Sequence, residues 1–113
     1  MTLAPIAMML DKIQKAFLAD RVYYSQHAKK EMEDEPFGII LDQEIFEALK
    51  NAELIENYPY DQPYPSCLLF GRTSTNRPIH MVAGYSNEDD VAIIITVYQP
   101  DPQRWIEYKR RKT

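Results

Sequence analysis

Six side chains of this sequence have the types needed for acid–base or phosphate chemistry: His27, Arg72, Arg77, His80, Thr96 and Tyr98. His80 lies between Ile79 and Met81 in a β-rich stretch, an unusual place for a titratable group without a partner. It is therefore either hydrogen-bonded within a sheet or catalytic. His27 either caps or packs a helix or is catalytic. Tyr98 either has a structural role at the end of a strand or is catalytic.

Metal, nucleotide and nucleophilic sites are not indicated. Two histidines, one cysteine and no clustered ligand spacing argue against a structural zinc site, so no metal or cofactor is expected. The sequence contains no glycine-rich phosphate loop and no Ser-His-Asp order. Cys67 lies in an apolar run, which favours a buried inert thiol over a nucleophile.

The segment 77–98 is the structural centre that must position the candidate side chains. Two apolar, β-rich runs, 77–86 and 91–98, flank four turn-forming residues, which predicts a hairpin. A further strand over 66–73 is expected to pair with the first run. Because the second run has a β-branched residue at nearly every position, both of its faces are expected to be buried.

The register of these strands decides whether His80 and Tyr98 meet, and the sequence leaves that register open. If the connection at 74–76 is a tight turn, Phe70 lies opposite His80. If the second loop has four residues, His80 faces Val97, and Tyr98 points to the other face of the sheet. A slip of one residue reverses that assignment and places Tyr98 beside His80.

Helices are predicted on both sides of these strands in the sequence. Helical spacing of apolar residues predicts helices over residues 6–19 and 43–50. A third helix is expected over residues 26–35, with Ser25 as its N-cap and Pro36 ending it. Two shorter extended segments are expected, at residues 21–24 and 53–58. Asp101 predicts the cap of a last helix, with Trp105 and Tyr108 on its inner face. The expected fold class is α+β, with helices packed on a small antiparallel sheet of three to four strands and with a C-terminal helix.

The length and charge of the chain restrict its number of domains, its location and its partners. Residues 1–113 are expected to form one domain, with 1–20 as an N-terminal helical addition, 21–108 as the core and 109–113 as a basic tail. No membrane span is indicated, and a single cysteine fits a reducing compartment, so the cytoplasm is the expected location. A net charge of −4 argues against a dedicated nucleic-acid binder. The charge is uneven, however, because ten acids lie within residues 31–61 and five bases within residues 104–112.

Three short motifs resemble a known family in their order and spacing. They are Ser25-x-His27-Ala28 opening a helix, Pro78-Ile-His80-Met-Val82 in a strand, and Ile95-Thr96-Val97-Tyr98-x-Pro100 at the end of the next strand. Together they resemble the family called domain of unknown function 4258, over about Tyr23 to Tyr108. That family is similar to the RelE/ParE-like toxins of bacterial toxin–antitoxin pairs.

The resemblance implies metal-independent cleavage of messenger RNA, with an antitoxin protein, mRNA or the ribosome as partner. Such cleavage needs a base for the 2′-hydroxyl, an acid for the leaving oxygen and a cation for the phosphate charge. The matching catalytic positions are His27, His80 and Tyr98, with Arg72 or Arg77 as the cation. RNA binding would fall to the basic end of the chain, at Arg104, Lys109, Arg110 and Arg111.

A non-catalytic function is the alternative hypothesis to RNA cleavage. Toxins of the RelE/ParE type are usually basic, because phosphate neutralisation supplies much of the affinity for RNA, whereas this chain is acidic. The same fold would then serve as a protein-binding or regulatory module. The acidic segment 31–61 would be its partner surface and the tyrosine- and proline-rich segment 58–65 a recognition loop. No oligomeric state is indicated.

Overall fold

The computed structural model describes the backbone of residues 3–113 and the side chains from residue 9 onward, so Met1 and Thr2 of the expected N-terminal addition lie outside the described residues. Its elements follow one another in the order α1 (Leu3–Leu18), β1 (Val22–Tyr24), α2 (Gln26–Asp34), α3 (Asp42–Lys50), β2 (Glu53–Tyr58), β3 (Ser66–Arg72), β4 (Pro78–Ser86), β5 (Val91–Tyr98), β6 (Trp105–Ile106) and β7 (Arg110–Arg111). The three expected helices and the five expected extended segments up to Tyr98 are therefore present, within a few residues of their predicted bounds.

The main sheet is mixed and has five strands, in the order β1-β5-β4-β3-β2. The expected antiparallel sheet of three to four strands is wrong, because β1 pairs with β5 in parallel, with Tyr23 opposite Ile93. The other neighbouring strands are antiparallel. A parallel pair needs no turn between its strands, so no local signal in the sequence marks the pairing of β1 with a strand so far along the chain.

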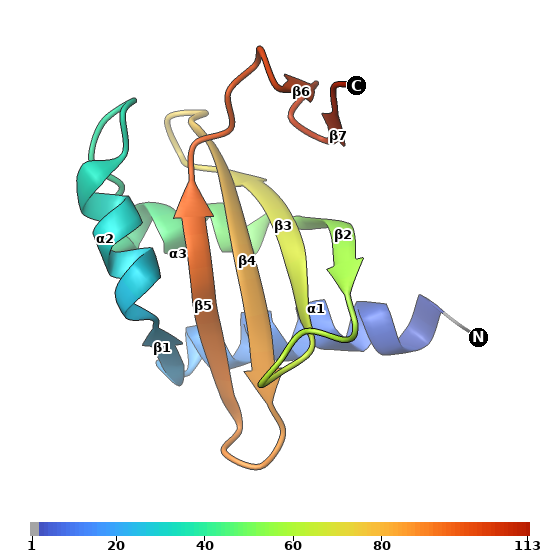
Figure 1. Ribbon diagram of the computed structural model, residues 1–113. Helices are drawn as coiled ribbons and strands as arrows, with labels where there is room; N and C mark the ends of the chain where they lie inside the picture. Colours follow the sequence, from blue (N-terminus) through green and yellow to red (C-terminus); the bar gives the residue numbers. More distant parts are fainter. Residues whose placement is uncertain (1–2) are drawn as a thin grey trace.

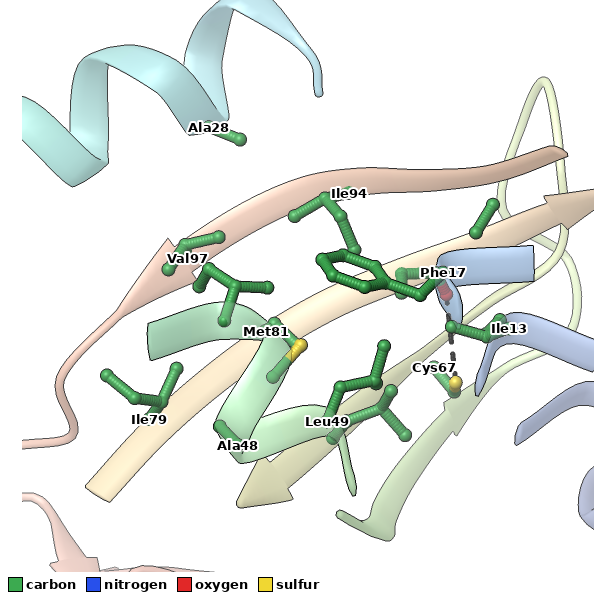
Figure 2. Packing of buried hydrophobic residues seen from close by; sticks show 14 of the residues in the cluster. Ile13, Phe17, Ala28, Ala48, Leu49, Cys67, Ile79, Met81, Ile94 and Val97 are labelled. Atoms are coloured by element: carbon green, nitrogen blue, oxygen red, sulfur yellow. Dashed lines mark hydrogen bonds between the residues drawn. The ribbon is translucent and has the colours of Figure 1, made fainter. Parts of the chain in front are cut away.

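The helices of the described chain pack on one face of this sheet. Figure 1 shows α1 and α3 crossing behind the strands and α2 running beside β5. Figure 2 shows the resulting core, where Phe17 and Leu49 from the helices meet Met81 and Ile94 from the sheet. Alternate residues of β3, β4 and β5 therefore point away from the helices, toward a second face.

Helix α3 approaches the sheet most closely at Gly71 of β3. A Cβ built on Gly71 would lie 1.9 Å from the carbonyl oxygen of Ala48. No side chain fits at that distance, so the missing Cβ allows the backbone of α3 to lie against the strand.

A β-bulge in β5 resolves the register that the sequence left open. Ser86 pairs with Val91, as a four-residue loop requires, but beyond the shift at Ala83 the partners change and His80 pairs with Tyr98. The extra residue in β5 is Ile95, which has no partner in β4. Both registers considered from the sequence are therefore present, one on each side of the bulge, and His80 and Tyr98 share a face.

The burial of β5 differs from the expectation. Ala92, Ile94 and Val97 are buried, whereas the residues between them are only half-buried. The expectation that both faces of this strand are buried is wrong, because the helices cover only one of them.

The expected C-terminal helix is also wrong. Asp101 starts a single turn, since its carbonyl accepts the backbone N–H groups of Arg104 and Trp105. The chain then reverses and forms the β6–β7 hairpin, in which Glu107 and Tyr108 have φ angles of 54° and 63°. A right-handed helix cannot contain such angles. The reversal brings the Tyr108 carbonyl to His80 and Arg111 over the Trp105 ring.

In the part of the chain that the structure describes, no helix has both the length and the apolar composition needed to cross a membrane.

Candidate functional site

The second face of the sheet carries the candidate site at the end where β5 stops. His80 and Phe70 alternate with the core residues of β4 and β3, so they point away from the helices. The β6–β7 hairpin lies over this end of the sheet (Figure 1). It presses Trp105 against His80, with 4.5 Å between the ring centres and an interplanar angle of 87°.

His80 is fully buried, with both ring nitrogens hydrogen-bonded. Nε2 lies 2.6 Å from the Tyr108 carbonyl oxygen and Nδ1 lies 3.1 Å from the Tyr98 hydroxyl. A carbonyl oxygen can only accept, so Nε2 carries the proton and Nδ1 accepts the hydroxyl proton of Tyr98. Burial lowers the pKa of His80 to about 4, and the imidazole is therefore neutral at pH 7.

Tyr98 connects the buried imidazole to solvent. Its side chain is half-buried, and burial raises its pKa to about 12, so the hydroxyl keeps its proton at neutral pH. If a ligand hydroxyl donates a hydrogen bond to the Tyr98 oxygen, the Tyr98 hydroxyl still donates its own proton to Nδ1 of His80. The pair can thus relay a proton from a ligand to the imidazole, or return it, without exposing His80.

A groove of about 770 Å³ opens beside Tyr98, between the start of the loop after α2 and the C-terminal segment. Three aromatic side chains line it, Phe37, Tyr98 and Trp105, together with the bases Arg104, Arg111 and Lys112. Its acids Glu35 and Asp101 accept backbone N–H groups, Glu35 from Phe37 and Gln99, and Asp101 from Gln103. These carboxylates are therefore turned toward the backbone.

Arg111 is the most firmly held of these bases. Its guanidinium donates to both carboxylate oxygens of Glu56 on β2, at 2.9 and 3.1 Å, and lies 4.7 Å from the centre of the Trp105 ring. The Glu56 carboxylate raises the pKa of Arg111 further above its ordinary value. Arg111 therefore stays protonated, and its charge is paired with that of the Glu56 carboxylate.

His27 lies on the other side of Tyr98. A smaller cavity of about 310 Å³ is lined by both side chains and by Glu31. The Nε2 atom of His27 lies 3.3 Å from one oxygen of Glu31, whose other oxygen accepts the backbone N–H of Val97. The two histidines are thus on opposite sides of one tyrosine, and His27 is exposed to solvent whereas His80 is not.

The two candidate arginines occupy different places. The Arg77 guanidinium is fully engaged: it donates to Gln99 at 2.7 Å, to Glu44 at 3.1 Å and to the carbonyl oxygens of Gly38 and Ile39. It ties the loop before α3 to the end of β5 and does not line the groove.

Arg72 lies on the site's face of the sheet. Its guanidinium lies 5.4 Å from the ring centres of Phe70 and Tyr108. It therefore packs against the hairpin that covers His80 and is not among the residues that line the groove.

The basic C-terminal residues are divided between the groove and β2. Lys109 pairs with Glu53 at 3.1 Å, and Arg111 pairs with Glu56. Arg104 lines the groove, and Arg110 is exposed in β7.

Sequence reasoning missed four residues of this site: Phe37, Glu56, Trp105 as a groove residue, and Lys112. For Glu56 the sequence contained one weak signal. This residue lies two residues before Tyr58 in an expected strand, so the two side chains share one face of that strand.

Comparison with known proteins places the chain in a family. Residues 24–99 match the family described as Domain of unknown function (DUF4258), a span that includes His27, His80 and Tyr98 and ends before the C-terminal hairpin. Searches of curated proteins and of solved structures found no match. Among the described residues, no group of three or more His, Cys, Asp or Glu side chains is arranged to hold a metal ion. The resemblance read from the motifs is thus confirmed at this level, and the chain belongs to the DUF4258 family.

Proposed function

We propose that the chain binds single-stranded RNA in the groove beside Tyr98 and cleaves it, acting as the toxin half of a bacterial toxin–antitoxin pair. One observation carries the proposal: the hydrogen bond between Tyr98 and the neutral imidazole of His80, at the wall of a groove with three bases. Kinship with the RelE/ParE-like toxins is part of this proposal and rests on the motif resemblance. The parallel β1–β5 pair is a departure from the antiparallel sheet expected from that resemblance.

In the proposed reaction the 2′-hydroxyl of one nucleotide attacks the adjacent phosphorus and the bond to the 5′-oxygen breaks. Tyr98 touches the RNA and takes up the 2′-hydroxyl proton while its own proton passes to Nδ1 of His80. His80 is a positioning residue, since it is buried and acts through Tyr98. Its pKa of about 4 makes it a weak base in the empty groove, and phosphate bound nearby would raise that pKa.

The remaining groups supply charge and the second proton transfer. Arg104 and Lys112 line the groove, where they can neutralise phosphate oxygens, and such neutralisation supplies much of the affinity for nucleic acids. Phe37, which is 55% exposed, offers an aromatic surface on which an unpaired base can stack. His27, in the cavity on the far side of Tyr98, is the candidate acid for the leaving 5′-oxygen.

Trp105 provides the first test, because it is the chain's single tryptophan and it lines the groove. Titration with a single-stranded RNA oligonucleotide should change its fluorescence, and the affinity should fall steeply with salt. Tyr98→Phe should keep that binding and lose cleavage of the RNA and growth arrest on expression. Tyr60→Phe is the matched control, since Tyr60 is 90% exposed and lies in the loop before β3.

RNA binding without cleavage by the wild-type chain would reject the proposed reaction, and cleavage that Tyr98→Phe leaves intact would remove Tyr98 from the mechanism. Normal growth together with an unchanged Trp105 signal would reject the RNA-directed function as a whole.

A second candidate function, a protein-binding module, is favoured by one surface. Phe37, Ile39 and Leu41 are 55%, 62% and 59% exposed, while Ile40 between them is buried. Three large apolar side chains on one exposed loop are typical of a contact surface for another protein. If RNA neither binds nor is cleaved, Ile39→Ser should release a protein that co-purifies with the wild-type chain, and Leu18→Ser, exposed on α1, should not.

A further inference from the structure

Glu56, on the edge strand β2, holds the C-terminal hairpin against the sheet. Its carboxylate accepts two hydrogen bonds from Arg111 and one from the Tyr58 hydroxyl. A two-pronged arginine–carboxylate contact fixes the angle of the guanidinium as well as its position. The same guanidinium covers the Trp105 ring, so Glu56 fixes both strands of the hairpin.

The hairpin, in turn, decides which nitrogen of His80 carries the proton. Its Tyr108 carbonyl accepts from Nε2, and this leaves Nδ1 as the acceptor for Tyr98. If the hairpin moved away, Nε2 would be open to water and either nitrogen could carry the proton. A proton on Nδ1 would break the hydrogen bond from the Tyr98 hydroxyl.

We propose that Glu56 is a positioning residue for the His80–Tyr98 pair: it clamps Arg111, the clamped hairpin selects the His80 tautomer, and that tautomer orients the Tyr98 hydroxyl. The proposal deepens the proposed function, on which it rests for the importance of Tyr98 to RNA cleavage. The second ion pair between the hairpin and β2 joins Lys109 to Glu53 by a single contact of 3.1 Å, which fixes the hairpin less than the two-pronged contact of Arg111 with Glu56.

Two opposite effects on His80 make the proposal testable. The charges that face it are Glu56 from β2 and Arg111 from β7, and Arg72 of β3 stacks on Tyr108. Burial is the main cause of its low pKa, while the negative charge of Glu56 raises that pKa. If the hairpin stayed closed after Glu56 is replaced by glutamine, the loss of this negative charge would therefore lower the pKa of His80. An opened hairpin would instead let water reach the imidazole, and the pKa would rise toward 6.5.

The experiment is a pH titration of the ¹⁵N-histidine-labelled full chain by NMR, without RNA. The wild-type spectrum should show Nε2 protonated and Nδ1 bare in the neutral imidazole of His80. Glu56→Gln should give a mixture of the two tautomers and a higher pKa. Glu88→Gln, an identical chemical change in the exposed turn between β4 and β5 at the opposite end of the sheet, should match the wild type (Figure 1).

A lower or unchanged pKa with the wild-type tautomer in Glu56→Gln would overturn the proposal. Arg111→Gln removes the clamp from the other side and should give the same spectrum, and the double variant should add little, because both changes break one contact. The spectra need no RNA, so they separate the two proposals. A clamp that fails in a protein that cleaves RNA refutes the clamp alone, and an intact clamp in a protein that ignores RNA refutes the function alone.

Discussion

The buried histidine predicts how the stability of the fold depends on pH. His80 has a pKa of about 4 in the folded chain and an ordinary value of 6.5 when exposed. Between these values the unfolded chain binds a proton that the folded chain does not, so acid favours unfolding. The contribution of His80 is complete above pH 6.5 and is lost as the pH falls toward 4.

The magnitude follows from the same two values. The span of about 2.5 pH units between them corresponds to about 3 kcal/mol of free energy of unfolding, at about 1.4 kcal/mol per unit. This is a large share of the about 5 to 15 kcal/mol that stabilises an ordinary domain.

Urea unfolding followed by Trp105 fluorescence and by circular dichroism measures this effect, at neutral pH and at about pH 5. Carboxylates also titrate in acid, so the quantity of interest is the difference between the wild type and His80→Gln at each pH. That difference should shrink as the pH falls, because the glutamine variant lacks the titrating group. Tyr60→Phe, which changes an exposed side chain and keeps both histidines, should retain the wild-type pH dependence. A difference between the wild type and His80→Gln that stays constant with pH would refute this account of a buried neutral imidazole.

Two further predictions concern the elements that place the site. Ser25→Ala removes the hydroxyl that accepts from the Ala28 N–H and donates to the Ile95 carbonyl at the bulge, so we expect a loss of about 1–2 kcal/mol in urea unfolding; an unchanged unfolding midpoint would show that the bulge does not need this cap. Gly71→Ala places a methyl group against the Ala48 carbonyl, and because backbone must move we expect a loss of about 3 kcal/mol. Wild-type stability in this variant would mean that α3 can shift away from β3 freely.

The local pattern of the chain predicted its elements well up to Tyr98. Helical spacing located α1 and α3, and the capping residue Ser25, together with Pro36, located α2. The first hairpin register, with Phe70 opposite His80, also followed from a short connection between strands. These features depend on neighbours in the sequence, which is why periodicity and turn residues suffice to find them.

The C-terminal segment shows where local pattern fails. Asp101, Trp105 and Tyr108 have helical spacing, but only one turn forms there. Bringing the Tyr108 carbonyl to His80 and Arg111 to Glu56 requires a reversal at residues 107–108. These contacts bring together parts of the chain that are far apart in sequence, and they outweigh a local preference of a few tenths of a kcal/mol per residue.

The sequence by itself determined which side chains could do chemistry and which short motifs place the chain in the DUF4258 family. It also determined that the choice of register would decide whether His80 and Tyr98 meet. Only the tertiary structure made that choice, by inserting Ile95 as a bulge where Ser25 bonds to its carbonyl. The physical reason is that the register of a strand is set by everything packed on it, including a cap from a helix seventy residues earlier.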